Sequence, residues 1–238
     1  MLGNDPSFFV SGCAESDVGL FGVIMPGRMR VFSPRWDTHA TIDFVPEKHA
    51  GLIILGDGEG WATSVRYQRE REWLAKALQY GTPFLGICYG AQLLAAYLDK
   101  KSDGKPLAKV RTKEHIGMLS EITVAVGGKT DPVVGHLAEG ALVTQYHEDA
   151  FQEPSGAIAL GWSKGHSHRH CEAFRIGEPE AAVYGLQFHP EPTLEMLQNE
   201  QWFKTTPPLT TLQRTVEAGE RALRAWVELA ITRRSERC

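Results

Sequence analysis

Cys88 is the residue best suited to nucleophilic chemistry in this chain of 238 residues. It lies in the sequence GICYG (residues 86–90), so a glycine stands two residues away on each side. The residues before it, FLGI, are typical of a buried strand, and those after it, YGAQLLAAYL, of a helix. A cysteine at such a turn has a strained backbone and an accessible sulfur, and the helix N-terminus favours its thiolate. The alternative is a cysteine packed in the core.

A candidate base and an orienting carboxylate follow in YGLQFHPE (residues 184–191). Residues 185–188 are typical of a strand that delivers His189 to its carboxyl end, where α/β sheets place their sites. Pro190 keeps the backbone extended, so His189 and Glu191 can project to the same side. Glu191 would accept from one ring nitrogen of His189 and leave the other facing the sulfur, as in a catalytic triad. A surface turn with an incidental His-Pro-Glu is the alternative.

The elements around these motifs alternate between apolar runs and amphipathic segments, which predicts an α/β fold. Residues 50–55 predict a buried strand, residues 64–80 a helix capped by Ser64, residues 84–87 a strand and residues 89–98 a helix. Further strands are expected in residues 8–10, 119–126, 141–151, 156–163, 171–177 and 181–189. An amphipathic helix is expected over residues 209–231, followed by a frayed polar tail. The order of the elements within residues 1–50 stays open.

Composition and charge exclude several classes of protein. The net charge is −4 and the pI about 6.1, so charge does not indicate nucleic-acid binding. We expect no signal peptide and no membrane span, because no apolar run approaches roughly 20 residues. The cysteines at positions 13, 88, 171 and 238 form no Cys-x-x-Cys pair, which argues against a zinc knuckle or a disulfide framework. We therefore expect a cytoplasmic protein.

Taken together, GICYG and the later QFHPE resemble the class I glutamine amidotransferases and their gamma-glutamyl hydrolase relatives. The resemblance runs from about Ala50 to Glu195 and includes HIGMLSEITV (115–124), DPVVGHL (131–137) and QYHEDAF (145–151). It implies a stand-alone GMP-synthase-like amidotransferase domain with a flavodoxin-like, mostly parallel central sheet and helices on both faces. It also implies that Cys88 attacks the amide, His189 transfers protons and Glu191 orients His189. We expect this domain to span residues 1–195, with a helical extension, residues 196–238, packed on it.

The resemblance also implies residues that bind substrate. Acyl transfer needs donors for a developing oxyanion. The Tyr89 N–H is one expected donor, and Gly58 supplies the second, with Asp57 as the alternative, although this loop lacks the proline usual in the family. Gln92 is expected to help hold the substrate glutamine, and the backbone around Tyr146 and His147 to receive its α-amino and carboxylate groups.

Two other motifs favour simpler interpretations. The loop GDGEG (56–60) lacks the spacing of a Gly-x-Gly-x-x-Gly dinucleotide turn. The stretch HSHRHC (166–171) contains metal-ligand types, but its position between two predicted strands favours a solvated hairpin tip. We therefore expect no metal and no organic cofactor.

Three functions remain open on the sequence alone. The first is an amidotransferase subunit that hydrolyses glutamine and passes ammonia to a synthetase partner, because the roughly 45 residues after the triad are too few for a synthetase domain. The second is a stand-alone hydrolase or peptidase that acts on a gamma-glutamyl compound. The third is a catalytically silent regulatory relative, which the presence of Cys88, His189 and Glu191 disfavours. The expected absence of a secretion signal favours the first function over the second.

Overall fold

The computed structural model describes residues 7–12, 18–32, 43–56, 68–102, 110–111, 118–137, 140–164, 169–199, 203 and 207–237. Within these residues, nine strands form one sheet in the order β2-β1-β3-β4-β11-β10-β9-β6-β7. The pairings from β2 to β11 are parallel, and those from β11 to β7 are antiparallel. The expected α/β sheet is confirmed, and its parallel part contains the strands that precede Cys88 and His189.

The strands of the parallel part are β1 (Ser7–Ser11), β2 (Met29–Phe32), β3 (His49–Ile54), β4 (Phe84–Ile87) and β11 (Val183–Leu186). The antiparallel part adds β6 (Met118–Val124), β7 (Leu142–Gln145), β9 (Ile158–Ser163) and β10 (Cys171–Arg175). A small separate ladder joins β5 (Val110–Arg111) to β8 (Asp149–Ala150). The three central strands β3, β4 and β11 are buried along their whole length, which explains their nearly continuous apolar sequences.

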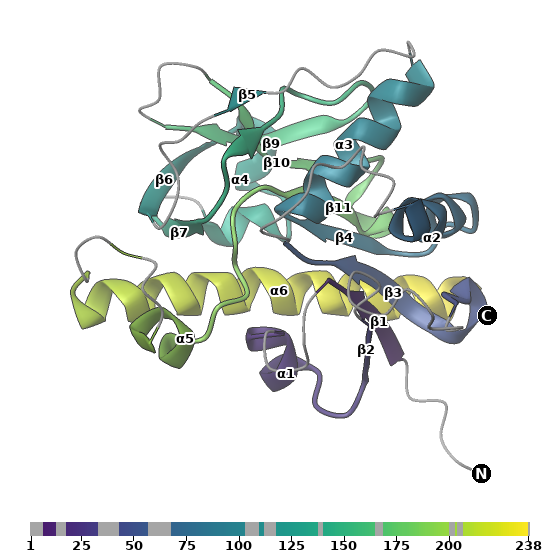
Figure 1. Cartoon of the computed structure of the whole chain (residues 1–238), viewed down its shortest axis with the longest axis horizontal. Helices are drawn as coiled ribbons and strands as arrows, with labels where there is room; N and C mark the ends of the chain where they lie inside the picture. Colours follow the sequence, from purple (N-terminus) through teal and green to yellow (C-terminus); the bar gives the residue numbers. More distant parts are fainter. Residues whose placement is uncertain are drawn as a thin grey trace.

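Helices cover both faces of the sheet (Figure 1). The long α6 (Leu209–Arg237) and the short α1 (Leu20–Ile24) lie on one face, and α2 (Gln68–Gln79) and α3 (Tyr89–Ser102) on the other. Trp226 of α6 packs against Phe8, with ring centroids 5.8 Å apart, and donates Nε1–H to the Ala182 carbonyl at 3.0 Å. The remaining helices are short: α4 (Val126–Lys129), α5 (Leu194–Asn199) and the 3₁₀ turns η2 (Pro46–Lys48), η4 (Val134–Leu137) and η5 (Pro179–Ala181).

Most predicted elements are confirmed, and two predictions are wrong. The stretch 141–151 is not one strand, because β7 ends at Gln145 and β8 begins at Asp149. The chain end is not frayed within the described residues, because α6 continues to Arg237. Arg234 donates to the Lys48 carbonyl at 3.0 Å and Arg237 to Thr82 Oγ1 at 2.8 Å, so the last helical turns are tied to the sheet.

The structure also defines elements that the sequence left open. The helix at Tyr89 extends to Ser102, and the first strands are β1 and β2 with α1 between them. The predicted cap Ser64 lies outside the described residues. Among the described helices, none combines the length and apolarity that a bilayer crossing requires.

Candidate active site

Cys88 lies at a tight turn between β4 and α3. Its φ of 52° is in the left-handed region, which a side chain other than glycine seldom adopts. A Cβ added at Gly86 would lie 2.4 Å from the Gly90 carbonyl, and one added at Gly90 would lie 2.0 Å from the Ile54 carbonyl oxygen. Both flanking positions therefore have room only for glycine. This geometry confirms the strand-to-helix turn expected from GICYG, and the Cys88 N–H ties it to β11 by donating to Leu186 at 2.7 Å.

His189 and Glu191 form the hydrogen-bonded pair expected from their spacing. Nδ1 of His189 lies 2.6 Å from Oε1 of Glu191, and both side chains are buried. Burial alone would lower the pKa of His189, because it disfavours the imidazolium. The charges of Glu191 and Cys88, with hydrogen bonds from both side chains, instead raise this pKa well above its ordinary value. The arrangement thus favours a protonated His189 between a carboxylate and the Cys88 sulfur.

Cys88 and His189 meet at Gly56, the residue that follows β3 by two positions. A Cβ at Gly56 would lie 2.7 Å from Cε1 of His189 and 3.4 Å from Cβ of Cys88. Strands β3, β4 and β11 are neighbours in the sheet, so their carboxyl ends bring these three residues to one edge. The sequence drew attention to the GDGEG loop, but it did not show that its first glycine faces both side chains.

The segment His189–Glu191 is clamped by three elements distant in sequence. The His189 N–H donates to the Thr144 carbonyl of β7 at 2.8 Å. The Glu191 carbonyl accepts from Leu20 of α1 at 2.7 Å. On the other side, a Cβ at Gly219 of α6 would lie 2.3 Å from the Pro190 carbonyl oxygen. The backbone that presents the histidine and the carboxylate is therefore fixed by long-range contacts, which the sequence alone did not indicate.

Tyr146 lies next to Cys88 and His189. The Cys88 thiol donates to the Tyr146 carbonyl at 3.8 Å, and the Tyr146 ring lies 6.5 Å from the His189 ring, centroid to centroid. The Tyr146 side chain is 43% exposed, whereas the neighbouring Gln145 and His147 point inward and are buried. Tyr146 is thus a partly exposed residue beside both Cys88 and His189.

Gln92 and Tyr89 are both buried on α3. The Gln92 amide donates to the Asp149 carbonyl at 3.0 Å and to Gln187 Oε1 at 3.3 Å. It therefore holds the segment after β7 in this structure. Tyr89 is the first residue of α3, so its backbone N–H lies at the N-terminus of that helix. The expected second oxyanion donor, Gly58, and its alternative Asp57 lie outside the described residues.

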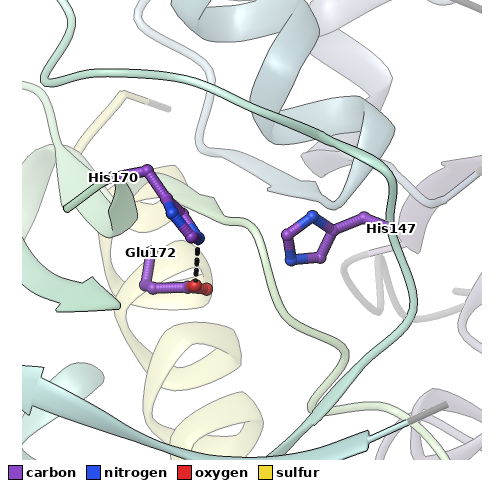
Figure 2. A group of neighbouring side chains, drawn as sticks. All are labelled: His147, His170 and Glu172. Carbon is purple, nitrogen blue, oxygen red and sulfur yellow. Dashed lines mark hydrogen bonds and ion pairs between the residues drawn. The ribbon is translucent and has the colours of Figure 1, made fainter. Parts of the chain in front are cut away.

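A buried polar cluster behind Tyr146 was not expected from the sequence. Its members are the fully buried Gln145, His170, Glu172 and Gln187, together with His147. His170 is the last residue before β10, so the expectation of a solvated tip is wrong at this position; residues 166–168 lie outside the described part. Ligand-type atoms of His147, His170 and Glu172 lie within 4.8 Å of one another (Figure 2). Hydrogen bonds already engage these atoms, so we assign no metal to them.

Comparisons with known proteins agree with the predicted family and fold. The family model "Glutamine amidotransferase class-I" matches residues 28–205. A glutamine-hydrolyzing GMP synthase of Caldicellulosiruptor saccharolyticus is 28% identical over 177 residues, covering 73% of this chain and 31% of the relative. A single subunit of the glutamine-hydrolyzing GMP synthase of Halobacterium salinarum is 28% identical over 154 residues, covering 63% of this chain and 75% of the relative. The chain thus spans about a third of the longer GMP synthase and most of the shorter subunit.

The fold is shared with a solved structure. The crystal structure of a glutamine amidotransferase from Thermotoga maritima superposes with a TM-score of 0.75 at 21% sequence identity. The superposition covers 95% of this chain and 98% of that one. The match includes nearly the whole chain, so it extends to the α/β sheet and to the helices on both of its faces.

Proposed function

The chain belongs to the class I glutamine amidotransferase family, and from this membership we propose that it hydrolyses the side-chain amide of glutamine at Cys88. The observation that carries the proposal is the convergence of Cys88 and His189 at Gly56, with Glu191 hydrogen-bonded to the far side of the imidazole. Cys88, His189 and Glu191 thus supply the nucleophile, the base and the orienting carboxylate that thioester chemistry requires.

The reaction proceeds in two steps. The Cys88 thiolate attacks the amide carbon, the C–N bond breaks, and ammonia leaves with a proton from His189, so that a γ-glutamyl thioester forms. A water molecule then gives a proton to His189 and its hydroxide to the thioester carbon. The C–S bond breaks, glutamate leaves, and the thiolate–imidazolium pair is restored. The balance is glutamine plus water giving glutamate plus ammonia.

The proposed substrate contacts are those that the family resemblance implies. The N–H of Tyr89, at the start of α3, donates to the oxyanion, and the loop at Gly58 or Asp57 supplies the second donor. The backbone of Tyr146 and His147 binds the α-amino and carboxylate groups of glutamine. Gln92 acts on the substrate through this segment, because its amide donates to the Asp149 carbonyl.

The ammonia is passed to a separate synthetase subunit. Support for a partner comes from the similarity to a relative that is itself one subunit of a glutamine-hydrolyzing GMP synthase, that of Halobacterium salinarum. The partner is accordingly a synthetase of the GMP synthase type.

A glutaminase assay of the purified chain tests this function. Glutamate release is measured with and without the added synthetase subunit of a GMP synthase, and the Cys88→Ala variant is the control. We expect release by the wild type that the Cys88→Ala substitution abolishes. Release from γ-glutamyl peptides but not from glutamine would select the stand-alone hydrolase instead. No release from either substrate, alone or with the partner, would contradict the proposal.

A further inference from the structure

The buried cluster behind Tyr146 connects three parts of the chain that are remote in sequence. Gln145 is the last residue of β7, and His147 lies two residues after it. Glu172 belongs to β10, and His170 directly precedes that strand. The Gln145 amide lies between the two pairs: its Oε1 is 2.7 Å from His147 Nε2 and its Nε2 is 3.1 Å from Glu172 Oε2. His170 Nε2 lies 2.8 Å from Glu172 Oε1 (Figure 2). The cluster also contacts α3. Gln92 of α3 donates to the Asp149 carbonyl, and His147 Nδ1 is hydrogen-bonded to the same carbonyl.

The hydrogen positions follow from which groups can donate. The Asp149 carbonyl can only accept, so His147 Nδ1, at 3.0 Å, carries a hydrogen. In a neutral ring, Nε2 would then be a bare acceptor, yet it lies 2.7 Å from the Gln145 carbonyl oxygen. Two acceptors do not approach so closely without a hydrogen between them. A hydrogen is therefore required on His147 Nε2 as well.

We infer that His147 is an imidazolium, balanced by the Glu172 carboxylate through the Gln145 amide, and that Glu172 is a positioning residue for the Tyr146 segment. Its effect on glutamine hydrolysis rests on the proposed function, but the protonation of His147 does not. The Gln145 carbonyl accepts from the imidazolium and its NH₂ donates to the carboxylate, so one amide links a buried cation to a buried anion. A buried charge requires such a partner to be tolerated.

The main alternative is a Gln145 side-chain amide turned by 180°, with its oxygen and nitrogen exchanged. A neutral His147 would then accept from the Gln145 NH₂, and the Gln145 carbonyl would need a proton from Glu172. The Gln145 amide lies 3.1 Å from Glu172 Oε2. This is an ordinary N–H···O length but longer than the roughly 2.5–3.0 Å of an O–H···O bond, which favours the imidazolium arrangement.

A metal ion bound by His147, His170 and Glu172 is a second alternative, because a cation could also lie between hydrogen-bond acceptors that face one another. Two ligand atoms on one tetrahedral zinc ion lie about 3.3 Å apart, given zinc–ligand bonds of about 2.0–2.1 Å. His170 Nε2 and Glu172 Oε1 are closer, at 2.8 Å, which is a hydrogen-bond distance. The described geometry therefore favours a proton over a metal ion.

The cluster acts on the site through Tyr146. Both neighbours of Tyr146, Gln145 and His147, have their side chains anchored in it, while the Tyr146 carbonyl accepts from the Cys88 thiol at 3.8 Å. Among the described residues, the ionisable groups around His147 include His170 and Glu172 on the β10 side, Asp149 on its own segment, and Cys88 and His189 beyond Tyr146. Loss of the hydrogen bonds that Glu172 accepts should thus loosen the segment without altering the triad.

The first test measures protonation directly. In ¹⁵N-histidine-labelled protein at neutral pH, with His147 assigned by a His147→Asn variant, both ring nitrogens of His147 should carry hydrogens. The Glu172→Gln variant can complete the same bonds with a reversed Gln145 amide, so its His147 should lose the hydrogen on Nε2 and keep that on Nδ1. A bare Nε2 in the wild type would overturn the inference, as would one equivalent of bound metal in the protein as purified. Neither readout depends on glutaminase activity.

The second test separates positioning from simple stabilisation. Glu172→Leu leaves the Gln145 amide and His147 without their anion, so we expect KM for glutamine to rise at least about tenfold with a smaller change in kcat. Glu172→Gln should recover most of this loss, and Glu153→Leu, which removes an exposed carboxylate from the β8–β9 connection, should leave KM unchanged. An unchanged KM in a folded Glu172→Leu enzyme would refute the positioning role.

Discussion

His189 Nδ1 lies 2.6 Å from Glu191 Oε1, and Pro190 between them keeps both side chains on the same side of the backbone. The Glu191 carboxylate can only accept, so Nδ1 carries the hydrogen and Nε2 is directed towards Cys88. The pair therefore determines both the orientation of the imidazole and its charge.

Replacing Glu191 with glutamine should reduce kcat for glutamine hydrolysis by about a thousandfold, because the amide no longer holds the correct tautomer. The pH dependence should change as well. Glu191 raises the pKa of His189, so its loss lowers that pKa and the imidazolium disappears at lower pH. The alkaline limb of the pH–rate profile should thus move to lower pH. Glu195→Gln, at an exposed position of α5, is the control and should leave the profile unchanged.

Gly56→Ala should abolish most activity while the protein remains folded. The new Cβ would lie 2.7 Å from His189 Cε1, so the imidazole must move away from the sulfur. Circular dichroism and kcat should be measured on the same sample. Gly127→Ala has open space around the new Cβ and should change neither. Full activity in Gly56→Ala would show that the described contact is not maintained in solution.

Gly90→Ala should destabilise the protein as a whole. Its Cβ would lie 2.0 Å from the Ile54 carbonyl oxygen, and this backbone atom cannot move without shifting β3. We expect the free energy of unfolding to fall by about 2–4 kcal/mol in a urea titration. A loss below about 0.5 kcal/mol would mean that α3 approaches β3 less closely than described.

His49 should make the protein less stable in acid. Burial first, then the charges of Arg30, Arg234 and Lys48, lower its pKa to about 4. Between its ordinary pKa of about 6.5 and about 4, the unfolded histidine binds a proton that the folded one does not. The free energy of unfolding should therefore decrease as pH falls through this window, by about 2 kcal/mol. His49→Phe should remove this part of the pH dependence, whereas His136→Gln should retain it.

Trp226→Ala should show that α6 is part of the folding unit. The indole is fully buried, contacts Phe8 and donates to the Ala182 carbonyl. Its truncation should cost about 3–5 kcal/mol in a single cooperative transition. Glu228→Ala, on the exposed side of α6, should cost less than about 0.5 kcal/mol. A two-step transition would instead support α6 as an independent extension.

The sequence alone determined the elements and residues whose signals are local. The glycines around Cys88 predict its turn because only glycine tolerates such close backbone approach, and the apolar runs predict β3, β4 and β11. His189 and Glu191 are two residues apart with a proline between them, so their pairing is also a local property.

Only the tertiary structure decided which distant residues meet these motifs. Gly56 faces Cys88 and His189 because β3, β4 and β11 are adjacent, and adjacency in a sheet depends on topology rather than spacing. The sequence predicted that His170 lies in a solvated hairpin tip and that Glu172 is an ordinary strand residue. Both are fully buried in the cluster with Gln145 and His147. Buried polar clusters assemble from several chain segments, and each member is stable there only when the others supply its hydrogen bonds. No single segment therefore carries a signal of the cluster behind Tyr146.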